Sequence, residues 1–353
     1  MRIYRRGNEP WGDYQMGSMA IEQFELKHDM FAKAMRKVDP SIKLIAGGAM
    51  PDVMTGANQS KRISGKFVPD YLSTADWSGH MLAHCLDDID MLSEHFYSTS
   101  NMHTDLKLEK KVNIGPQSLV EWERAPATQV RVKYEHYQEY LKLIPALKAK
   151  PVPIAIDEWA YMDRDSPPGS YKVVPAYAWA FHEMFRHSDL FQLGAFTFAT
   201  AMIDEDRTCA VLSPTGLLFK MYREHFGSIP AEVSEDSPQP KPIYPPGGDQ
   251  PEVNPGSDTY PLDVSAALSD DQKTLTFAVL NPSDSEQHLN ISINGAKLAN
   301  QGRLWRMAPS SVNATVTVGQ HPGVEVEEKQ ITAVTDTMLV PPFSVNICSF
   351  PLQ

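Results

Sequence analysis

Four short, largely apolar segments in the first 230 residues constrain most strongly what this chain can fold into. They are residues 42–46, 89–93, 152–156 and 191–199. Apolar segments of this length are typical of strands that are buried on both faces, as in a parallel sheet. The first part of the chain is therefore expected to contain a buried parallel sheet.

Segments with helical periodicity separate these strands. Residues 21–38 have an apolar stripe, and Asp39-Pro40 ends the segment. Its members are Ile21, Phe24, Phe31, Ala34, Met35 and Val38. Residues 130–147 and 171–187 have a similar pattern, and a further helix begins at Ser213-Pro214 and ends at Gly227. Alternating strands and helices predict an α/β fold with right-handed crossovers.

The composition and pattern of the sequence change after residue 230. Seven prolines lie between Pro238 and Pro255, which indicates a linker or irregular wrap over residues 231–259. The remainder, 260–353, alternates polar and apolar residues, as an all-β C-terminal sandwich does. Its expected strands are 262–267, 274–280, 289–293, 314–318, 337–340 and 344–350. Residues 1–230 form the expected catalytic domain.

Composition and charge narrow the classes of partner. The 353 residues are 42% hydrophobic and 22% charged, as in an ordinary globular protein. A net charge of −12 argues against non-specific binding to nucleic acid or to a membrane surface, and permits a neutral partner such as a sugar. No apolar segment approaches the ~20 residues that span a bilayer. No signal peptide is visible, so a cytoplasmic location is expected if Met1 is the authentic start.

Possible metal ligands occur at one place in the sequence. His80 and His84 are four residues apart on an expected helix, and Cys85 and two aspartates follow. The pair lacks the His-Glu-x-x-His pattern and lies away from the strand ends. The three cysteines form no C-x-x-C pair. We therefore expect neither a metal nor an organic cofactor.

Polar and aromatic residues occur together after three expected strands, at 7–12, 94–97 and 157–161. The carboxyl ends of parallel strands meet at one edge of a sheet or barrel, where ligands bind. An aromatic ring can cover the apolar face of a sugar, and two carboxylates can perform the acid and nucleophile work of glycoside hydrolysis. These segments therefore favour carbohydrate chemistry.

The same segments resemble the retaining (β/α)8 glycosidases, and most closely glycoside hydrolase family 51, the α-L-arabinofuranosidases. Gly7-Asn8-Glu9 and Asp157-Glu158-Trp159 match the two catalytic motifs of that clan. Order and spacing agree over nearly the whole chain. The supporting segments are 7–17, 34–45, 88–97, 154–159, 262–267 and 339–345.

The resemblance implies a role for each matching residue. Glu9 would be the general acid/base, with a raised pKa, and Glu158 the nucleophile of a double displacement. Asn8 would bond the sugar hydroxyl next to the anomeric carbon. His95 and Tyr97 would orient Glu158, while Trp11 and Trp159 would form sugar-stacking walls.

Two local departures from the family pattern bear on which sugar the site would bind. Position 160 is Ala where the family has Asn, and residues 194–199 lack the amide side chains that face the sugar in the family. Phe196 and Phe198 could reshape that wall or belong to the core, and the core is favoured for Phe198. The expected activity is α-L-arabinofuranosidase on arabinose-containing oligo- or polysaccharides. A β-xylosidase or endo-glucanase activity in the same framework is the alternative.

The start of the chain is the largest departure. Glu9 would end the fourth barrel strand, yet Met1 lies eight residues before it, so only strands four to eight are expected here. An incomplete barrel exposes two parallel edges. The chain could be a fragment of a longer protein, pair with a second polypeptide, or close its barrel as a homo-oligomer. A non-catalytic subunit that needs a partner chain is the competing hypothesis.

Overall fold

The computed structural model describes most of the chain. The described residues are 3–5, 7–12, 14–51, 60–63, 66–99, 102–105, 110–113, 118–162, 167, 169–234, 261–332 and 337–353. The linker predicted at 231–259 therefore lies outside the described residues, apart from its first four positions.

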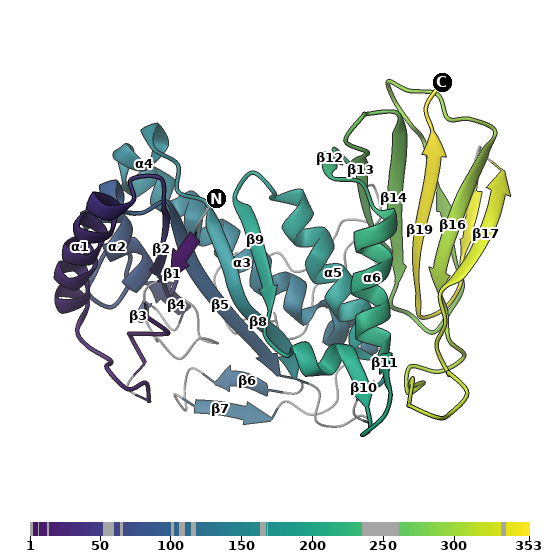
Figure 1. Ribbon diagram of the computed structural model, residues 1–353, viewed down its shortest axis with the longest axis horizontal. Helices are drawn as coiled ribbons and strands as arrows, with labels where there is room; N and C mark the ends of the chain where they lie inside the picture. The colour runs from purple at the N-terminus through teal and green to yellow at the C-terminus, as the bar shows by residue number, and fades with distance from the viewer. Residues whose placement is uncertain are drawn as a thin grey trace.

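A curled sheet of five parallel strands forms the first half of the molecule (Figure 1). The strands follow chain order across the sheet, and each pairs in parallel with the next. They are β1 (Ile3–Arg5), β2 (Lys43–Gly47), β5 (Met91–Thr99), β8 (Ile154–Met162) and β9 (Phe191–Phe196). The predicted α/β class and the partial barrel are confirmed, since β1 and β9 lie at opposite edges of this sheet.

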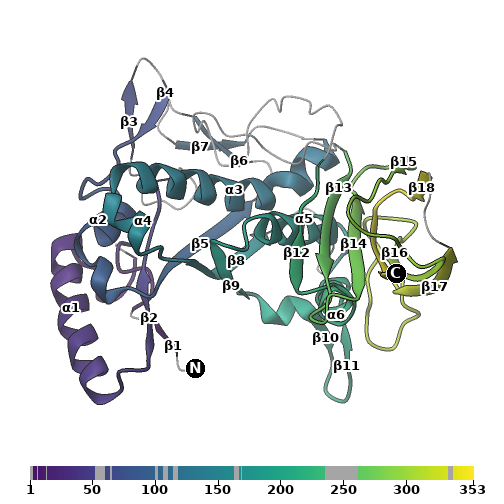
Figure 2. The same cartoon turned by 90° about the horizontal axis from the view of Figure 1, so that it is seen from above.

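Helices connect consecutive strands and cover one face of the sheet (Figure 2). α1 spans the predicted range, whereas α3 begins before residue 130 because the Ser118 hydroxyl accepts a hydrogen bond from the Glu121 N–H and caps the helix. The helices are α1 (Ile21–Val38), α2 (Trp77–His84), α3 (Leu119–Leu143), α4 (Pro145–Ala149), α5 (Val173–Arg186) and α6 (Pro214–His225), with short 3-10 turns η1 (Leu86–Asp88) and η2 (Ala199–Met202).

Three small antiparallel hairpins follow strands of the parallel sheet. They leave β2, β5 and β9 at their carboxyl ends, so they extend the edge at which the predicted site residues lie. The hairpins are β3 (Ser60–Ile63) with β4 (Lys66–Pro69), β6 (Met102–Asp105) with β7 (Lys110–Asn113), and β10 (Ile203–Glu205) with β11 (Ala210–Leu212).

The C-terminal part is antiparallel, as predicted. A six-stranded sheet has the order β12-β13-β14-β19-β16-β17, and a separate pair joins β15 to β18. The bounds are β12 (Ile229–Ala231), β13 (Asp263–Leu268), β14 (Thr274–Asn281), β15 (Gln287–Asn290), β16 (Gln301–Met307), β17 (Glu327–Thr332), β18 (Thr337–Val340) and β19 (Ser344–Pro351). The strand β12 joins this sheet although it precedes the predicted linker.

The strand expected at 314–318 does not form. The carbonyl of Ala314 instead accepts a hydrogen bond from the backbone N–H of Tyr171, so this segment contacts the chain just before α5. Two strands that were not predicted from the sequence, β16 and β17, lie at one end of the sheet, with β17 at its edge.

One large apolar core joins the two parts of the molecule. It contains residues of the parallel sheet and its helices, such as Leu92 and Trp179, together with Val345 and Ile347 of β19. A second core packs the other face of the six-stranded sheet against β15 and β18, and includes Phe277 and Val340. The six-stranded sheet is therefore buried on both faces at its centre.

The buried stripe of α1 differs from the predicted one. Ile21, Phe24, His28 and Ala32 are buried, whereas Phe31 is 53% and Val38 87% exposed. The two stripes share only Ile21 and Phe24, and of the later predicted residues Met35 packs against Ala32, Ile42 and Leu44. No helix among the described residues is long and apolar enough to cross a membrane.

Candidate active site

Strand alternation divides the side chains of β5 between two faces. Phe96 packs in the large core, and Glu94 is fully buried against Lys133 of α3. His95 and Tyr97 therefore lie on the opposite, concave face. His95 is directly opposite Glu158 in the parallel pairing of β5 with β8. This register brings two of the predicted site segments together.

The backbone at Glu9 turns sharply after β1. Glu9 has φ 41° and follows Gly7 with φ 71°, both in the left-handed region. The Gly12 N–H closes the turn on the Glu9 carbonyl at 2.9 Å. Such a conformation costs a non-glycine residue of order 1–3 kcal/mol and clusters at functional sites. The turn aims the Glu9 carboxylate at the concave face.

Three neighbours hold the Glu9 carboxylate. Its Oε1 lies 2.9 Å from His95 Nδ1. Its Oε2 accepts hydrogen bonds from the Tyr14 hydroxyl at 2.9 Å and the Gln15 amide at 3.2 Å. The side chain is 11% exposed, so it is fixed but still reachable.

Glu158 is held from a neighbouring strand. The Tyr97 hydroxyl donates to Glu158 Oε1 at 2.5 Å, and it lies 3.0 Å from the Thr197 hydroxyl oxygen. His95 Nδ1 lies 3.5 Å from Glu158 Oε2. One side-chain atom each of Glu9, His95 and Glu158 lies within 4.8 Å of the others. The structure thus brings the two predicted catalytic carboxylates together.

The other nitrogen of His95 faces a third carboxylate. His95 Nε2 lies 3.4 Å from Asp157 Oδ1, which also accepts a hydrogen bond from the Ser93 hydroxyl at 2.7 Å. His95 is 5% exposed, so these contacts fix the plane of its ring.

The electrostatics of Glu9 differ from the expectation. The His95 hydrogen bond is the largest influence and lowers the pKa of Glu9, and the Tyr14 and Gln15 bonds also lower it. Burial acts in the opposite direction but does not prevail. The raised pKa predicted for this residue is therefore wrong for the protein without a ligand, because hydrogen-bond donors surround the carboxylate.

Tyr97 keeps its proton. Burial and the hydrogen bond to Glu158 raise the pKa of its hydroxyl. The hydroxyl therefore remains a donor to Glu158 throughout the ordinary pH range.

The remaining predicted site residues, Asn8, Trp11 and Trp159, differ in how exposed their side chains are. Trp11 is half-buried, and its indole N–H donates to the Gly48 carbonyl at 3.2 Å. Asn8 is exposed, and its side chain makes no hydrogen bond among the described residues. The Trp159 ring is 1% exposed and stacks on Phe96 in the core. A sugar-stacking role does not fit Trp159, because strand alternation turns it away from Glu158.

Several site residues were not predicted. Tyr14 and Gln15 reach Glu9 because the loop after β1 folds back, which no sequence pattern indicated. Asp157 lies within β8, next to Glu158, and Thr197 directly follows β9, and these positions were the available signal. Phe198 is 40% exposed and 6.0 Å from the Tyr97 ring, so its favoured assignment to the core is wrong.

Glu9, His95 and Glu158 also offer a possible set of metal ligands. Hydrogen bonds explain how these side chains are held without a metal. Tyr14, Gln15 and Tyr97 donate to the two carboxylates. His95 lies between the carboxylates and bridges them. The arrangement is suited to proton transfer and nucleophilic attack between two carboxylates.

No protein-family profile matches the chain. A sequence relative, probable alpha-L-arabinofuranosidase C of Aspergillus flavus, is 26% identical over 180 residues, which are 46% of this chain and 28% of the relative. The matched sequence thus spans less than a third of that relative's length.

Solved structures match nearly the whole chain. The GH51 alpha-L-arabinofuranosidase from Thermotoga petrophila RKU-1 has a TM-score of 0.72 at 20% identity, over 99% of this chain and 66% of that one. CelM2, a bifunctional glucanase-xylanase from a metagenome library, has a TM-score of 0.61 at 15% identity, over 100% of this chain and 65% of that one. The resemblance to family 51 is thereby confirmed at the level of the fold.

Proposed function

We propose that the chain carries the catalytic centre of a retaining glycoside hydrolase of the α-L-arabinofuranosidase type. The observation that carries the proposal is the approach of Glu9 and Glu158, whose nearest side-chain oxygens lie within 4.8 Å of each other. Retaining enzymes hold their carboxyl groups about 5–5.5 Å apart, whereas inverting enzymes need about 6.5–9.5 Å for a water molecule. The spacing supports a double displacement.

Glu158 is the proposed nucleophile. The Tyr97 hydroxyl donates to Glu158 Oε1, which leaves Oε2 to attack the anomeric carbon. The attack forms a covalent glycosyl-enzyme while the glycosidic oxygen leaves with a proton.

Glu9 is the proposed acid/base. In the first step it donates its proton to the leaving oxygen, and in the second it removes a proton from water that attacks the glycosyl-enzyme. The lowered pKa of Glu9 suits the second step in the protein without a ligand. The first step needs the protonated acid, so the proposal implies an activity optimum on the acid side of neutrality.

The proposed substrate is a terminal arabinofuranosyl group on an oligo- or polysaccharide. The sequence relative is named as an arabinofuranosidase, and Trp11 and Asn8 are accessible at the same end of the sheet. The glucanase-xylanase neighbour keeps β-xylosidase or endo-glucanase activity as the alternative. Thr197 and Phe198 stand in the segment that lacks amides, so they would help to set the sugar.

The open edges of the sheet support a further proposal. β1 and β9 each have one strand neighbour among the described residues, and a closed barrel of this type has eight strands. Met30 and Phe31 expose apolar side chains on α1, and Phe31 lines a pocket together with Tyr4 of β1. We propose that a further polypeptide segment, in the same protein or a partner, supplies the missing strands. The alternative is a non-catalytic subunit.

The test is hydrolysis of 4-nitrophenyl α-L-arabinofuranoside by the protein as it is purified from its source. We expect activity, loss of about 10³-fold or more in kcat in Glu158→Ala, and partial rescue by azide with a glycosyl azide product. Glu139→Gln, which changes an exposed carboxylate on α3, is the matched control.

The product's stereochemistry and the protein's mass separate the alternatives. Proton NMR of the first-formed sugar should show retained anomeric configuration. Native mass spectrometry should show additional polypeptide or a homo-oligomer. Inactivity on arabinofuranosides, xylosides and glucans despite a complete barrel would favour the non-catalytic subunit.

A further inference from the structure

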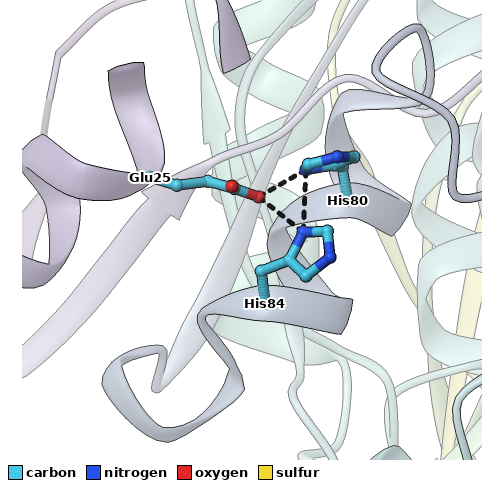
Figure 3. A group of neighbouring side chains, drawn as sticks. All are labelled: Glu25, His80 and His84. Atoms are coloured by element: carbon cyan, nitrogen blue, oxygen red, sulfur yellow. Dashed lines mark hydrogen bonds and ion pairs between the residues drawn. The ribbon is translucent and has the colours of Figure 1, made fainter. Parts of the chain in front are cut away.

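A second cluster of titratable side chains lies away from the catalytic carboxylates. Glu25 projects from α1, and His80 and His84 project from α2 (Figure 3). The histidines are four residues apart, so they lie on the same face of their helix. Glu25 Oε1 is bonded to His80 Nδ1 and lies 3.0 Å from His84 Nδ1. The two Nδ1 atoms lie 2.9 Å apart.

When Glu25 is ionised, protons cannot satisfy all three contacts of this triangle. An ionised carboxylate only accepts hydrogen bonds, so both Nδ1 atoms would have to donate to Glu25. Two N–H groups would then face each other at the 2.9 Å separation of His80 and His84. If one nitrogen gives up its proton, its lone pair faces the carboxylate instead. A cation at the centre accepts all three lone pairs at once.

The spacing is close to that of a metal site. Zn²⁺ binds imidazole nitrogen and carboxylate oxygen at about 2.0–2.2 Å, which places two ligand atoms of a tetrahedral site about 3.3 Å apart. The separations of 2.9 and 3.0 Å need a few tenths of an ångström of outward side-chain movement, and the shorter Glu25–His80 contact needs a larger one. His84 is 53% exposed and can make that movement.

The surroundings favour a cation and leave one side open. An open groove of about 710 Å³ adjoins the cluster, and its lining includes Asp29, Asp87 and Asp88. Lys33 also lines the groove, but its charge is paired with Asp29 at 2.7 Å. The groove gives an ion a path to the exposed side of His84 and leaves space for a water ligand.

We propose that Glu25, His80 and His84 bind a divalent transition-metal ion, with Zn²⁺ as the best match. Two imidazoles and one carboxylate select this class over Ca²⁺ and Mg²⁺, which prefer sites made of oxygen ligands. The ion joins α1 to α2, two helices that follow adjacent strands of the parallel sheet. This inference is independent of the proposed hydrolase activity.

From the sequence alone, no metal is expected at this histidine pair. The histidine spacing was visible there, but the carboxylate comes from a helix 55 residues earlier. Only the packing of α1 against α2 brings Glu25 to the pair.

The test is titration of chelator-treated full-length protein with ZnCl₂, followed by calorimetry. We expect one Zn²⁺ per chain at this site, and a Kd at least about tenfold weaker in both His84→Ala and Glu25→Gln. Co²⁺ should give a tetrahedral absorption spectrum that these variants lose. Zinc should raise the Tm of the parent protein by a margin that both variants lose.

Two controls separate this site from other zinc sites. His288→Ala removes an exposed histidine of β15 and should leave the zinc affinity unchanged. Glu158→Gln should also leave it unchanged, because the catalytic cluster is a different group. Circular dichroism without zinc confirms that the variants fold. The proposal is overturned if the parent binds no zinc, or if His84→Ala and Glu25→Gln bind it as the parent does.

Discussion

The imidazole of His95 links three carboxylates. It contacts Glu9 and Glu158 through Nδ1 and Asp157 through Nε2. The ring is buried, so these contacts hold the three carboxylates around one imidazole. Its hydrogen bond to Glu9 is the largest influence that lowers the pKa of that carboxylate.

Replacing His95 with Ala should raise the pKa of Glu9. The substitution removes the largest influence that lowers this pKa, while burial continues to raise it. A general acid must be protonated, so the alkaline limb of the profile of kcat/KM against pH should move to higher pH. A ¹³C NMR titration of the Glu9 carboxyl measures the shift directly. Tyr14→Phe is the comparison and should shift the pKa in the same direction by less.

Tyr97→Phe should reduce kcat more than it changes KM. The variant keeps the ring beside Phe198 and loses only the hydroxyl that positions Glu158. We expect a loss of about 10–100-fold in kcat, since charge-assisted hydrogen bonds contribute about 1.5–3 kcal/mol. Steady-state kinetics on an aryl arabinofuranoside measures it, with Tyr134→Phe on α3 as control. An equal loss of kcat in Tyr97→Phe and Tyr134→Phe would contradict a positioning role for the Tyr97 hydroxyl.

The sequence predicts the meeting of Glu9 with Glu158 because each follows a segment expected to be a parallel strand, although β8 itself continues past Glu158 to Met162. It cannot predict Tyr14 or Gln15, because their contacts depend on a loop that reverses after a left-handed residue. The burial of Trp159, in contrast, could have been predicted from the sequence. A period of two places neighbours of Glu158 on the opposite face, which contains the core.

At the scale of elements, one buried carboxylate joins α3 to α5 beside their apolar contacts. Glu183 of α5 is 1% exposed and lies 3.0 Å from both Arg131 of α3 and Arg186 of its own helix. Burial alone would raise the pKa of Glu183, but the hydrogen bond from His187 and the two arginines lower it to about 2. The carboxylate is therefore ionised in the folded protein throughout the physiological range.

The pKa of Glu183 predicts acid sensitivity. The folded value of about 2 is below the ordinary value of 4.5, so ionised Glu183 stabilises the fold above pH 4.5. This stabilisation, about 3 kcal/mol, is lost as the pH falls from 4.5 towards 2. Urea unfolding should show Glu183→Gln less stable than the parent at pH 7 and nearly equal to it at pH 2. Glu139→Gln, at an exposed pair, should change stability by less than about 0.5 kcal/mol.

Helix α1 shows which features hydrophobic periodicity can predict and which it cannot. α1 has its predicted ends, because Asp39-Pro40 cannot continue the helix. Its buried face was mispredicted, since an apolar stripe indicates that a face is covered without saying by what. Phe31 and Val38 are exposed in this chain. Their exposure fits the proposal that a further segment covers this side.

At the scale of the whole molecule, α5 connects the parallel sheet to the C-terminal sheet. Its residues His182 and Arg186 both bind Asp263 of β13, and the His182–Asp263 contact is 2.5 Å. The Tyr171 hydroxyl donates to the Met307 carbonyl of β16 at 3.1 Å. The large core also crosses this boundary. The sequence predicted two domains, but it could not show that they share a core, since an apolar strand face does not identify its partner.

The shared core predicts that both parts unfold together. Calorimetry should show one transition whose van't Hoff and calorimetric enthalpies agree. Asp263→Asn should lower its Tm, because burial disfavours the ionised form but the charge of Arg186 and the His182 hydrogen bond prevail and keep the pKa of Asp263 low. Removing the negative charge leaves Arg186 without this partner, at a cost of about 3 kcal/mol.

Hydrogen exchange tests whether the two parts of the molecule unfold together. Amides of β8 and β14 should lose protection together as temperature rises, in the parent and in Asp263→Asn. Asp271→Asn, in the exposed turn between β13 and β14, is the matched control and should leave the Tm within about 1 °C. Loss of protection in β14 well below the temperature at which β8 opens would show two independent units. The α5 contacts would then join domains that fold separately.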